Sequence, residues 1–429
     1  MSINESEYST ERVPPEKTGG WIAVALVSAM VAFSLPTFVA GVELFAVMDN
    51  RLAIMAVLLG GAILTVIGAL MGAIGSRTRL SSYLLVRVAF GNRGAAVANL
   101  AFAISLLGWF GFNINLFSIT VVRLFSDLGV GGVPVWVIEV FAGGIMTVTT
   151  LFGFRAINRL SMVLTPVLML VTALLVATII GDYELGALIA TSRLAETSFG
   201  DGVSSVVGGI IVGAIILPDI TRFIRDWRGA VYTAVLSYLV VGSIVMIAGG
   251  LVSSASNNPD FLDVMISVGL GWAAFAIVIA GSWVLNALNL YSTALSTRAT
   301  FPTLNESALI VVLGIGGTVA AFANIIDAFL DFLFYLSVVF VPVAGVIIID
   351  YWRSGAERYE SSLESDIGVG ERPVAMISWV GGAVIALLAA EGYLSLSGIA
   401  ALDAMLCSAV LFALLSLATR RRDVARSAP

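Results

Sequence analysis

Long apolar runs separated by short polar segments recur along almost the whole chain. A helix needs about 20 mainly apolar residues to cross the hydrocarbon core of a bilayer. The pattern predicts an all-α polytopic membrane protein, because barrel strands would instead alternate over about ten residues. Twelve transmembrane helices are predicted at 21–47, 52–75, 95–123, 133–153, 160–181, 203–224, 229–254, 270–296, 306–325, 328–350, 374–392 and 398–419.

Positive charges fall mainly on one side of these predicted spans. If the amino terminus is cytoplasmic, only Arg51, Arg123 and Arg193 of the 22 Lys and Arg residues lie outside. Cytoplasmic loops of membrane proteins are enriched in Lys and Arg. We therefore expect a multi-pass protein of the inner (plasma) membrane with both termini in the cytoplasm.

Two of the predicted spans are interrupted by helix-breaking residues. Pro36 lies within the first span, and the segment Gly208–Pro218 of the sixth span contains three glycines and a proline. Irregular backbone at membrane depth is tolerated only where it is buried in protein or lines a cavity. Paired interruptions of this kind mark the substrate site of secondary transporters. The sequence therefore predicts a transporter with two broken helices at its site.

The order of spans predicts a transport core followed by accessory helices. Ten spans can form two five-span units of opposite orientation, each beginning with an interrupted span. The predicted divisions are a disordered cytoplasmic tail 1–20, a core 21–350 with repeats 21–181 and 203–350, a cytoplasmic loop 351–373, two accessory helices 374–419 and a basic cytoplasmic tail 420–429.

Composition supports a membrane protein and excludes most enzyme classes. Hydrophobic residues make up 59% of the chain and charged residues 12%, about half the charged share of a soluble domain. The chain has no histidine and a single cysteine, which excludes Ser-His-Asp catalysis, Cys/His zinc sites and histidine proton relays. We expect no catalytic activity, no cofactor and no metal site. A channel is disfavoured because no ring of charges is visible.

Carboxamide and indole side chains lie in the middle of two predicted spans. Trp109 and Asn113 are four residues apart and share a helix face, as do Asn286 and Asn289, which are three apart. An indole beside amides suits a flat ring with hydrogen-bonding edges. The alternative is structural: a tryptophan packed between helices, and amides that bond neighbouring spans.

Several stretches resemble the nucleobase:cation symporter-1 family, which includes bacterial cytosine permeases and fungal purine–cytosine permeases. This resemblance implies a leucine-transporter-type 5+5 inverted-repeat fold with two accessory helices and cation-driven uptake of a nucleobase. It also implies a site between the first, third, sixth and eighth spans. The stretches are GSRTRLSSYLLVRVAFGNRG (75–94), GWFGFN (108–113), LPDITRF (217–223), NALNLYSTALS (286–296) and PVAGVIIIDYW (342–352).

The same resemblance implies roles for individual residues. Trp109 matches the stacking tryptophan, Asn113 a polar position one turn later, and Asn286 the asparagine that bonds the substrate edge. Asn286 and Asn289 before Tyr291 look most like the fungal branch. Further substrate contacts are expected at Ser34, Phe38, Gly209 and Ile210, and the first-span region of Ala32, Phe33 and Pro36 matches the part whose carbonyls line the cation site.

Two departures from the family pattern bear on the substrate and the coupling ion. Ile210 stands where relatives have a second aromatic, and Val284 and Leu285 stand where sodium-coupled relatives have hydroxyls. A hard cation requires oxygen ligands, so proton coupling, or no ion coupling, is favoured over sodium. The alternatives are a sodium-coupled transporter or a carrier of a related ring: a hydantoin, allantoin or a pyrimidine vitamin precursor.

Proton coupling requires a carboxylate within the membrane. Glu43, one turn beyond the first-span interruption, is the first candidate, followed by Asp327 with Asp331, and then Glu139. The alternative for each is a carboxylate bonded to water near the outer interface. The pair Asp219 and Arg222, three residues apart, is predicted to form an ion pair that locks the inner gate.

Overall fold

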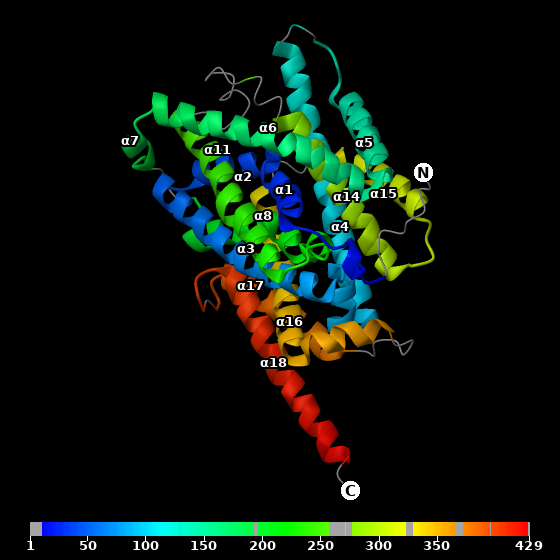
Figure 1. Ribbon diagram of the computed structural model, residues 1–429. Coiled ribbons are helices and arrows are strands. Elements are labelled where there is room, and N and C mark those ends of the chain that lie inside the picture. Colours follow the sequence, from blue (N-terminus) through cyan, green and yellow to red (C-terminus); the bar gives the residue numbers. More distant parts are fainter. Residues whose placement is uncertain are drawn as a thin grey trace.

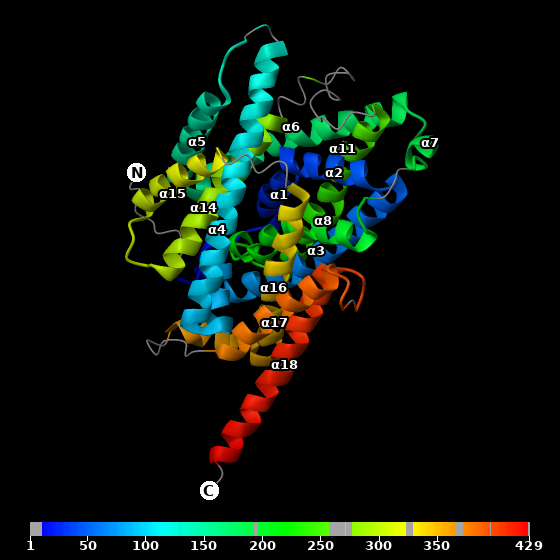
Figure 2. The same cartoon turned by 180° about the vertical axis from the view of Figure 1, so that it is seen from behind.

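The computed structural model describes residues 11–127, 129, 131–192, 196–256, 271, 277–322, 329–364, 372–394 and 396–427. In this part of the chain the secondary structure is helical, apart from one isolated bridge between Gly19 and Ile224. The helices pack into one bundle, from which the carboxyl-terminal part of α18 extends at one end (Figures 1 and 2). The all-α prediction is confirmed.

The helices follow one another with short connections. Their bounds are η1 Pro15–Lys17, α1 Trp21–Ala32, α2 Leu35–Val47, α3 Asn50–Thr78, α4 Ser82–Asp127, α5 Val135–Leu151, α6 Gly153–Asp182, α7 Leu185–Ile189, α8 Phe199–Ile215, α9 Pro218–Thr221, α10 Trp227–Ala234, η2 Val235–Gly242, α11 Ser243–Ser256, η3 Ile277–Gly281, α14 Ser282–Thr300, α15 Glu306–Ala321, α16 Phe329–Glu364, α17 Pro373–Ala390 and α18 Ala400–Ser427.

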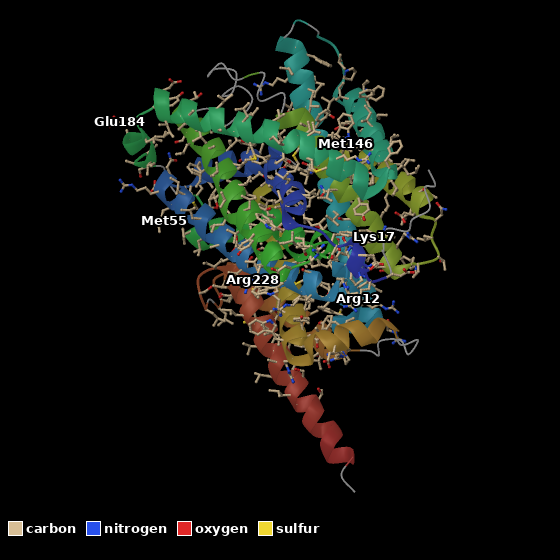
Figure 3. The ribbon with its side chains drawn as sticks, in the orientation of Figure 1. Arg12, Lys17, Met55, Met146, Glu184 and Arg228 are labelled. Carbon is tan, nitrogen blue, oxygen red and sulfur yellow. The ribbon has the colours of Figure 1, made fainter. Side chains whose placement is uncertain are left out.

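Several of these helices are suited to a lipid environment. Within the described residues, eight helices are long and apolar enough to cross a bilayer, and the bent pair α1–α2 could form a ninth span. Large apolar side chains point outwards, among them Met55 (Figure 3), which is 56% exposed, and Phe141, which is 66% exposed. Such surface is stable against lipid rather than water. The count of twelve spans remains a prediction.

The first predicted interruption is present. Helix α1 ends at Ala32, α2 begins at Leu35, and the two are bent by 47°. Pro36 lies in the first turn of α2, where its missing N–H costs no helical hydrogen bond. The break therefore falls at Phe33 and Ser34, directly before the proline.

The second interruption lies at the carboxyl-terminal end of the predicted segment Gly208–Pro218. Helix α8 runs unbroken from Phe199 to Ile215, through all three glycines, and the chain leaves the helix only at Ile216, before Pro218 begins α9. The break thus falls beside the proline of the segment, and the helix is not broken at its glycines. At Gly208 the reason is close packing, because a Cβ there would lie 1.6 Å from the carbonyl oxygen of Leu333 in α16.

We expect Gly208→Ala to destabilise the protein. The added methyl group would force α8 and α16 apart, and such overpacking costs ~1–3 kcal/mol. The thermal midpoint of the purified protein in detergent should fall. Gly209→Ala is the matched control, since its Cβ would meet the nearest atom, Leu333 Cδ1, at an ordinary 3.5 Å. Equal midpoints for the two variants would contradict the close contact.

Three helices extend beyond the predicted spans. Helix α4 begins at Ser82, with a kink at Gly91 where φ is +76°. Helix α16 continues past a similar kink at Gly355 to Glu364, inside the predicted loop 351–373. Helix α18 continues to Ser427, through most of the predicted tail. Polar composition predicts exposure but does not by itself end a helix.

The second half of the predicted disordered tail is held by hydrogen bonds. The amide of Val13 donates to the Arg79 carbonyl at 3.1 Å, and that of Gly19 to the Phe223 carbonyl at 2.8 Å. The Arg225 amide donates to the Gly19 carbonyl at 3.0 Å. Residues 11–20 thus lie against the α3–α4 turn and the segment after α9, which corrects the expectation of disorder there. Residues 1–10 lie outside the described residues.

The transmembrane helices form two groups that meet at the centre of the molecule. In one, α3 packs against α8, α10 and η2, and α1 packs against α10 and η2. In the other, α4, α5, α14 and α15 pack against one another. Helix α16 packs along α8 and also contacts α4, α17 and α18. The candidate site lies between the two groups.

Candidate functional site

A cavity of about 100 Å³ lies between the two groups of helices. Its walls come from α1, α2, α4, α8, α9, η2, α11, α14 and α16, and most of the side chains are apolar. An apolar cavity with a few polar groups is typical of a small-molecule site. The lining includes Ser34, Thr37, Trp109, Ile210, Tyr238 and Asn289.

Trp109 of α4 forms a firmly held aromatic wall of this cavity. Its ring meets Phe112, Phe329 and Phe332 edge-on, with centroid distances of 5.7, 6.2 and 5.4 Å. Phe112 and Phe329 in turn stack on each other at 4.6 Å. Edge-to-face aromatic pairs stabilise a fixed orientation, so the indole is ordered before any ligand arrives.

Asn289 of α14 is the carboxamide that lines the cavity. Its side-chain Nδ2 is buried and has no hydrogen-bond partner among the described residues. A buried donor without a partner is costly, and an amide can donate two hydrogen bonds. A ligand carbonyl or ring nitrogen in the cavity could accept from this group.

The structure does not bring Asn113 and Asn286 into the cavity lining. Asn113 Nδ2 donates to the carbonyl of Trp109 in its own helix at 2.8 Å. Asn286 Nδ2 donates to the Phe110 carbonyl at 3.1 Å and lies 3.3 Å from the sulfur of Met146 in α5 (Figure 3). The bond between α14 and α4 fits the structural alternative for Asn286.

Other predicted contacts divide between the lining and the surrounding core. Ser34 and Pro36 at the first-span break line the cavity, as do Gly209 and Ile210. The Ser34 hydroxyl donates to the Val31 carbonyl at 2.7 Å, which satisfies a carbonyl at the end of α1. Phe33 and Phe38 are buried but lie outside the lining.

The described carboxylates that were predicted to carry a proton also lie outside the cavity lining. Glu43 is half-buried on α2, and Asp331 is exposed at the start of α16. Glu139 is buried on α5, where Asn115 Nδ2 donates to it at 2.8 Å. Asp327 lies outside the described residues. None of these three described acids therefore lines the candidate substrate position.

Asp219 does line the cavity, but its carboxylate contacts α4. One oxygen accepts from both the amide and the hydroxyl of Ser82, each at 2.8 Å. Arg222 Nε donates to the backbone carbonyl of Asp219 at 3.1 Å. The carboxylate therefore caps the start of α4, where a negative charge is favourable, and the ion pair with Arg222 stays a prediction.

Sequence reasoning missed two buried polar residues near the site. Tyr238 of η2 lines the cavity, and the hydroxyl of Ser282, at the start of α14, is buried without a partner among the described residues. Neither stands out in the sequence, because a single tyrosine or serine in an apolar span is usually a packing residue. Only the tertiary arrangement shows which way they face.

A bent first span and a cavity between two groups of membrane helices are typical of a secondary transporter. Residues 13–411 match the family model described as permease for cytosine/purines, uracil, thiamine, allantoin, and the chain belongs to this family. Its members are permeases, so the chain is a membrane transporter and not an enzyme. The resemblance to the nucleobase:cation symporter-1 family is thereby confirmed.

Individual relatives and solved structures agree with this assignment. The cytosine permease of Escherichia coli (strain K12) is 28% identical over 422 residues, which cover 98% of this chain and 97% of the relative. The hydantoin permease of Microbacterium maritypicum is 23% identical, over 79% of this chain and 73% of the relative.

Two solved structures show the fold. Mhp1, a nucleobase-cation-symport-1 family transporter in a closed conformation with bromovinylhydantoin bound, matches with a TM-score of 0.81 at 20% identity, over 96% of this chain and 94% of its own. A Na⁺-coupled sialic acid symporter matches with a TM-score of 0.69 at 12% identity, over 95% and 92%. The leucine-transporter-type fold class is confirmed.

Proposed function

We propose that this permease imports a nucleobase, cytosine or a purine such as hypoxanthine, across the inner (plasma) membrane by alternating access, with both termini in the cytoplasm. The observation that carries the proposal is the pairing of an ordered indole, Trp109, with the unpartnered amide of Asn289 in one cavity. A flat heterocycle with polar edges uses both groups. The sequence similarity to a cytosine permease supports the same class of substrate.

In this proposal the substrate ring stacks on Trp109, and Asn289 Nδ2 donates to its polar edge. Stacking on an aromatic side chain is worth ~1–3 kcal/mol per base. Gly209 and Ile210 of α8 also line the cavity, as does Ser34 at the first-span break. Asn289 thus takes the role that the family resemblance gave to Asn286. In this proposal the buried residues Asn113, Asn286 and Phe38 stabilise the site without contacting the substrate.

Proton coupling is the form of energy coupling that we propose. The positions of the two hydroxyls in sodium-coupled relatives hold Val284 and Leu285, which are buried and apolar. Without those oxygens a hard cation has few ligands. Glu43, half-buried on α2, the helix that follows the first-span break, is the proposed proton carrier. The Asp219–Ser82 contact is the proposed closure of the inner gate, with Arg222 held against the Asp219 backbone.

One observation favours sodium coupling as a second candidate. Gly281 packs so closely on the first-span break that a Cβ there would lie 2.9 Å from the carbonyl oxygen of Phe33. The next residue, Ser282, has a buried hydroxyl with no partner among the described residues. A carbonyl and a hydroxyl are both oxygen ligands that Na⁺ can use.

Uptake of labelled cytosine, hypoxanthine and uracil into cells expressing the protein tests both the proposed substrate and the proposed coupling ion. We expect saturable uptake of at least one base in sodium-free buffer, and its loss when a proton ionophore is added. Uptake that requires sodium and resists the ionophore would select the second candidate. A competition panel with hydantoin and allantoin follows, and uptake of only those rings would contradict the nucleobase proposal.

A further inference from the structure

Tyr238 occupies an unusual position beside the cavity. It lies within η2, a π-helical segment in the middle of the continuous helical stretch Trp227–Ala255. π-Helical turns are rare and frequently occur at functional sites. The side chain is buried and lines the cavity together with Gly213. No family motif or predicted contact includes this residue.

Two glycines of α3 lie against Tyr238, one at its ring and one at its backbone. A Cβ at Gly68 would lie 2.4 Å from Cε2 of the ring. A Cβ at Gly61 would lie 3.2 Å from the backbone carbonyl oxygen of Tyr238. The absence of side chains at these positions allows α3 and η2 to approach closely, and the phenol is directed towards α8.

The Tyr238 hydroxyl donates a hydrogen bond to the backbone carbonyl of Gly213 at 3.2 Å. Gly213 is in the last turn of α8, which ends at Ile215. The final four carbonyls of a helix have no partner within it. The phenol therefore satisfies a carbonyl that the end of α8 leaves open, directly beside the cavity.

We propose that Tyr238 is a positioning residue for transport: its hydroxyl fastens the last turn of α8 to η2, within the group that α1, α3, α8, α10 and η2 form, so that these elements move as one body. This proposal rests on the proposed function for its transport readout. Alternating access requires one group of helices to move against the other around the substrate. An α8 end that moves independently would transmit this motion poorly, although the substrate would still bind.

Tyr238→Phe is the direct test, because it removes the hydroxyl and keeps the ring. In the purified wild-type protein and the variant, without substrate, hydrogen exchange is measured by mass spectrometry on peptides covering 209–217. We expect exchange in these peptides to be roughly fivefold faster in the variant, as the loss of one hydrogen bond implies. Unchanged exchange would overturn the proposal, and this readout does not depend on any substrate.

Transport kinetics provide the second readout. We expect the maximal uptake rate to fall roughly fivefold, while the equilibrium Kd for labelled cytosine remains within about twofold of wild type. A weaker Kd with unchanged exchange would mean that the hydroxyl contacts substrate, which would also overturn the proposal. If the wild-type protein binds no nucleobase, the proposed function fails, and the exchange measurement still decides the role of Tyr238.

Two further variants complete the design. Gly68→Ala displaces the ring from the α3 side and should reproduce both effects of Tyr238→Phe. Tyr232→Phe is the matched control, because Tyr232 lies on α10, is 53% exposed and is outside the cavity lining. It should leave exchange and uptake at wild-type values. Equal effects of Tyr232→Phe and Tyr238→Phe would contradict a specific bond to α8.

Discussion

Trp109→Ala is expected to abolish measurable uptake while the protein is still made and inserted. The variant removes the aromatic wall of the cavity, and the loss of stacking costs ~1–3 kcal/mol. This corresponds to an increase in Kd of roughly 5- to 150-fold. Equilibrium binding of labelled cytosine to the purified protein measures the change directly.

Two further variants separate stacking from general destabilisation. Trp109→Phe keeps an aromatic ring and should retain part of the affinity. Trp136→Ala removes a tryptophan that is 59% exposed on α5 and outside the cavity lining, so its Kd should equal that of wild type. If Trp109→Ala binds cytosine as tightly as wild type, the indole is not part of the site.

Asn289→Ala is expected to weaken substrate binding, whereas Asn286→Ala is expected to lower the stability of the protein. Asn289 lines the cavity with an unpartnered Nδ2, so its replacement should weaken binding roughly tenfold and leave the thermal midpoint in detergent unchanged. Asn286 bonds the Phe110 carbonyl, so its replacement should lower the midpoint, by the equivalent of ~1–3 kcal/mol, and leave Kd within about twofold.

The contrast between these two variants is informative because they lie one turn apart on the same helix. A large loss of affinity in Asn286→Ala, together with a normal Kd in Asn289→Ala, would restore the assignment suggested by the family resemblance. It would also mean that α14 turns during binding, since Asn286 faces Phe110 and Met146 in this structure.

The fold class was predictable from the sequence because it depends on local chemistry. Runs of apolar residues define helices in a membrane regardless of their neighbours. Pro36 predicts the first break because its ring and missing N–H act on its own helix. The family motifs then select one arrangement of such helices. These signals required no knowledge of tertiary contacts.

The details of the site were less predictable because they depend on which helices meet. Asn286 and Asn289 share a broad face of α14, but only packing decides that one meets α4 and the other the cavity. In the sequence Gly208 predicts an interrupted helix, whereas in the structure it allows α8 to approach the backbone of Leu333 closely. The proposed role of Tyr238 depends on its hydrogen bond to Gly213 at the end of α8, which the sequence does not reveal.

Tertiary contacts also explain why the order of the amino-terminal segment was not predicted. Its polar composition predicts disorder, yet Val13 is buried and its amide bonds the Arg79 carbonyl. The partner groups come from the α3–α4 turn and the segment after α9, which are far away in sequence. Backbone groups at helix ends lack hydrogen-bond partners within the helix, but the sequence does not reveal which segment supplies those partners.

An experimentally determined structure with bound cytosine tests the central claim most directly. We predict that the ring lies against the Trp109 indole at stacking distance, about 3.5–4 Å, with Asn289 Nδ2 within hydrogen-bond reach of its edge. Cytosine bound elsewhere, or in contact with neither Trp109 nor Asn289, would contradict the account.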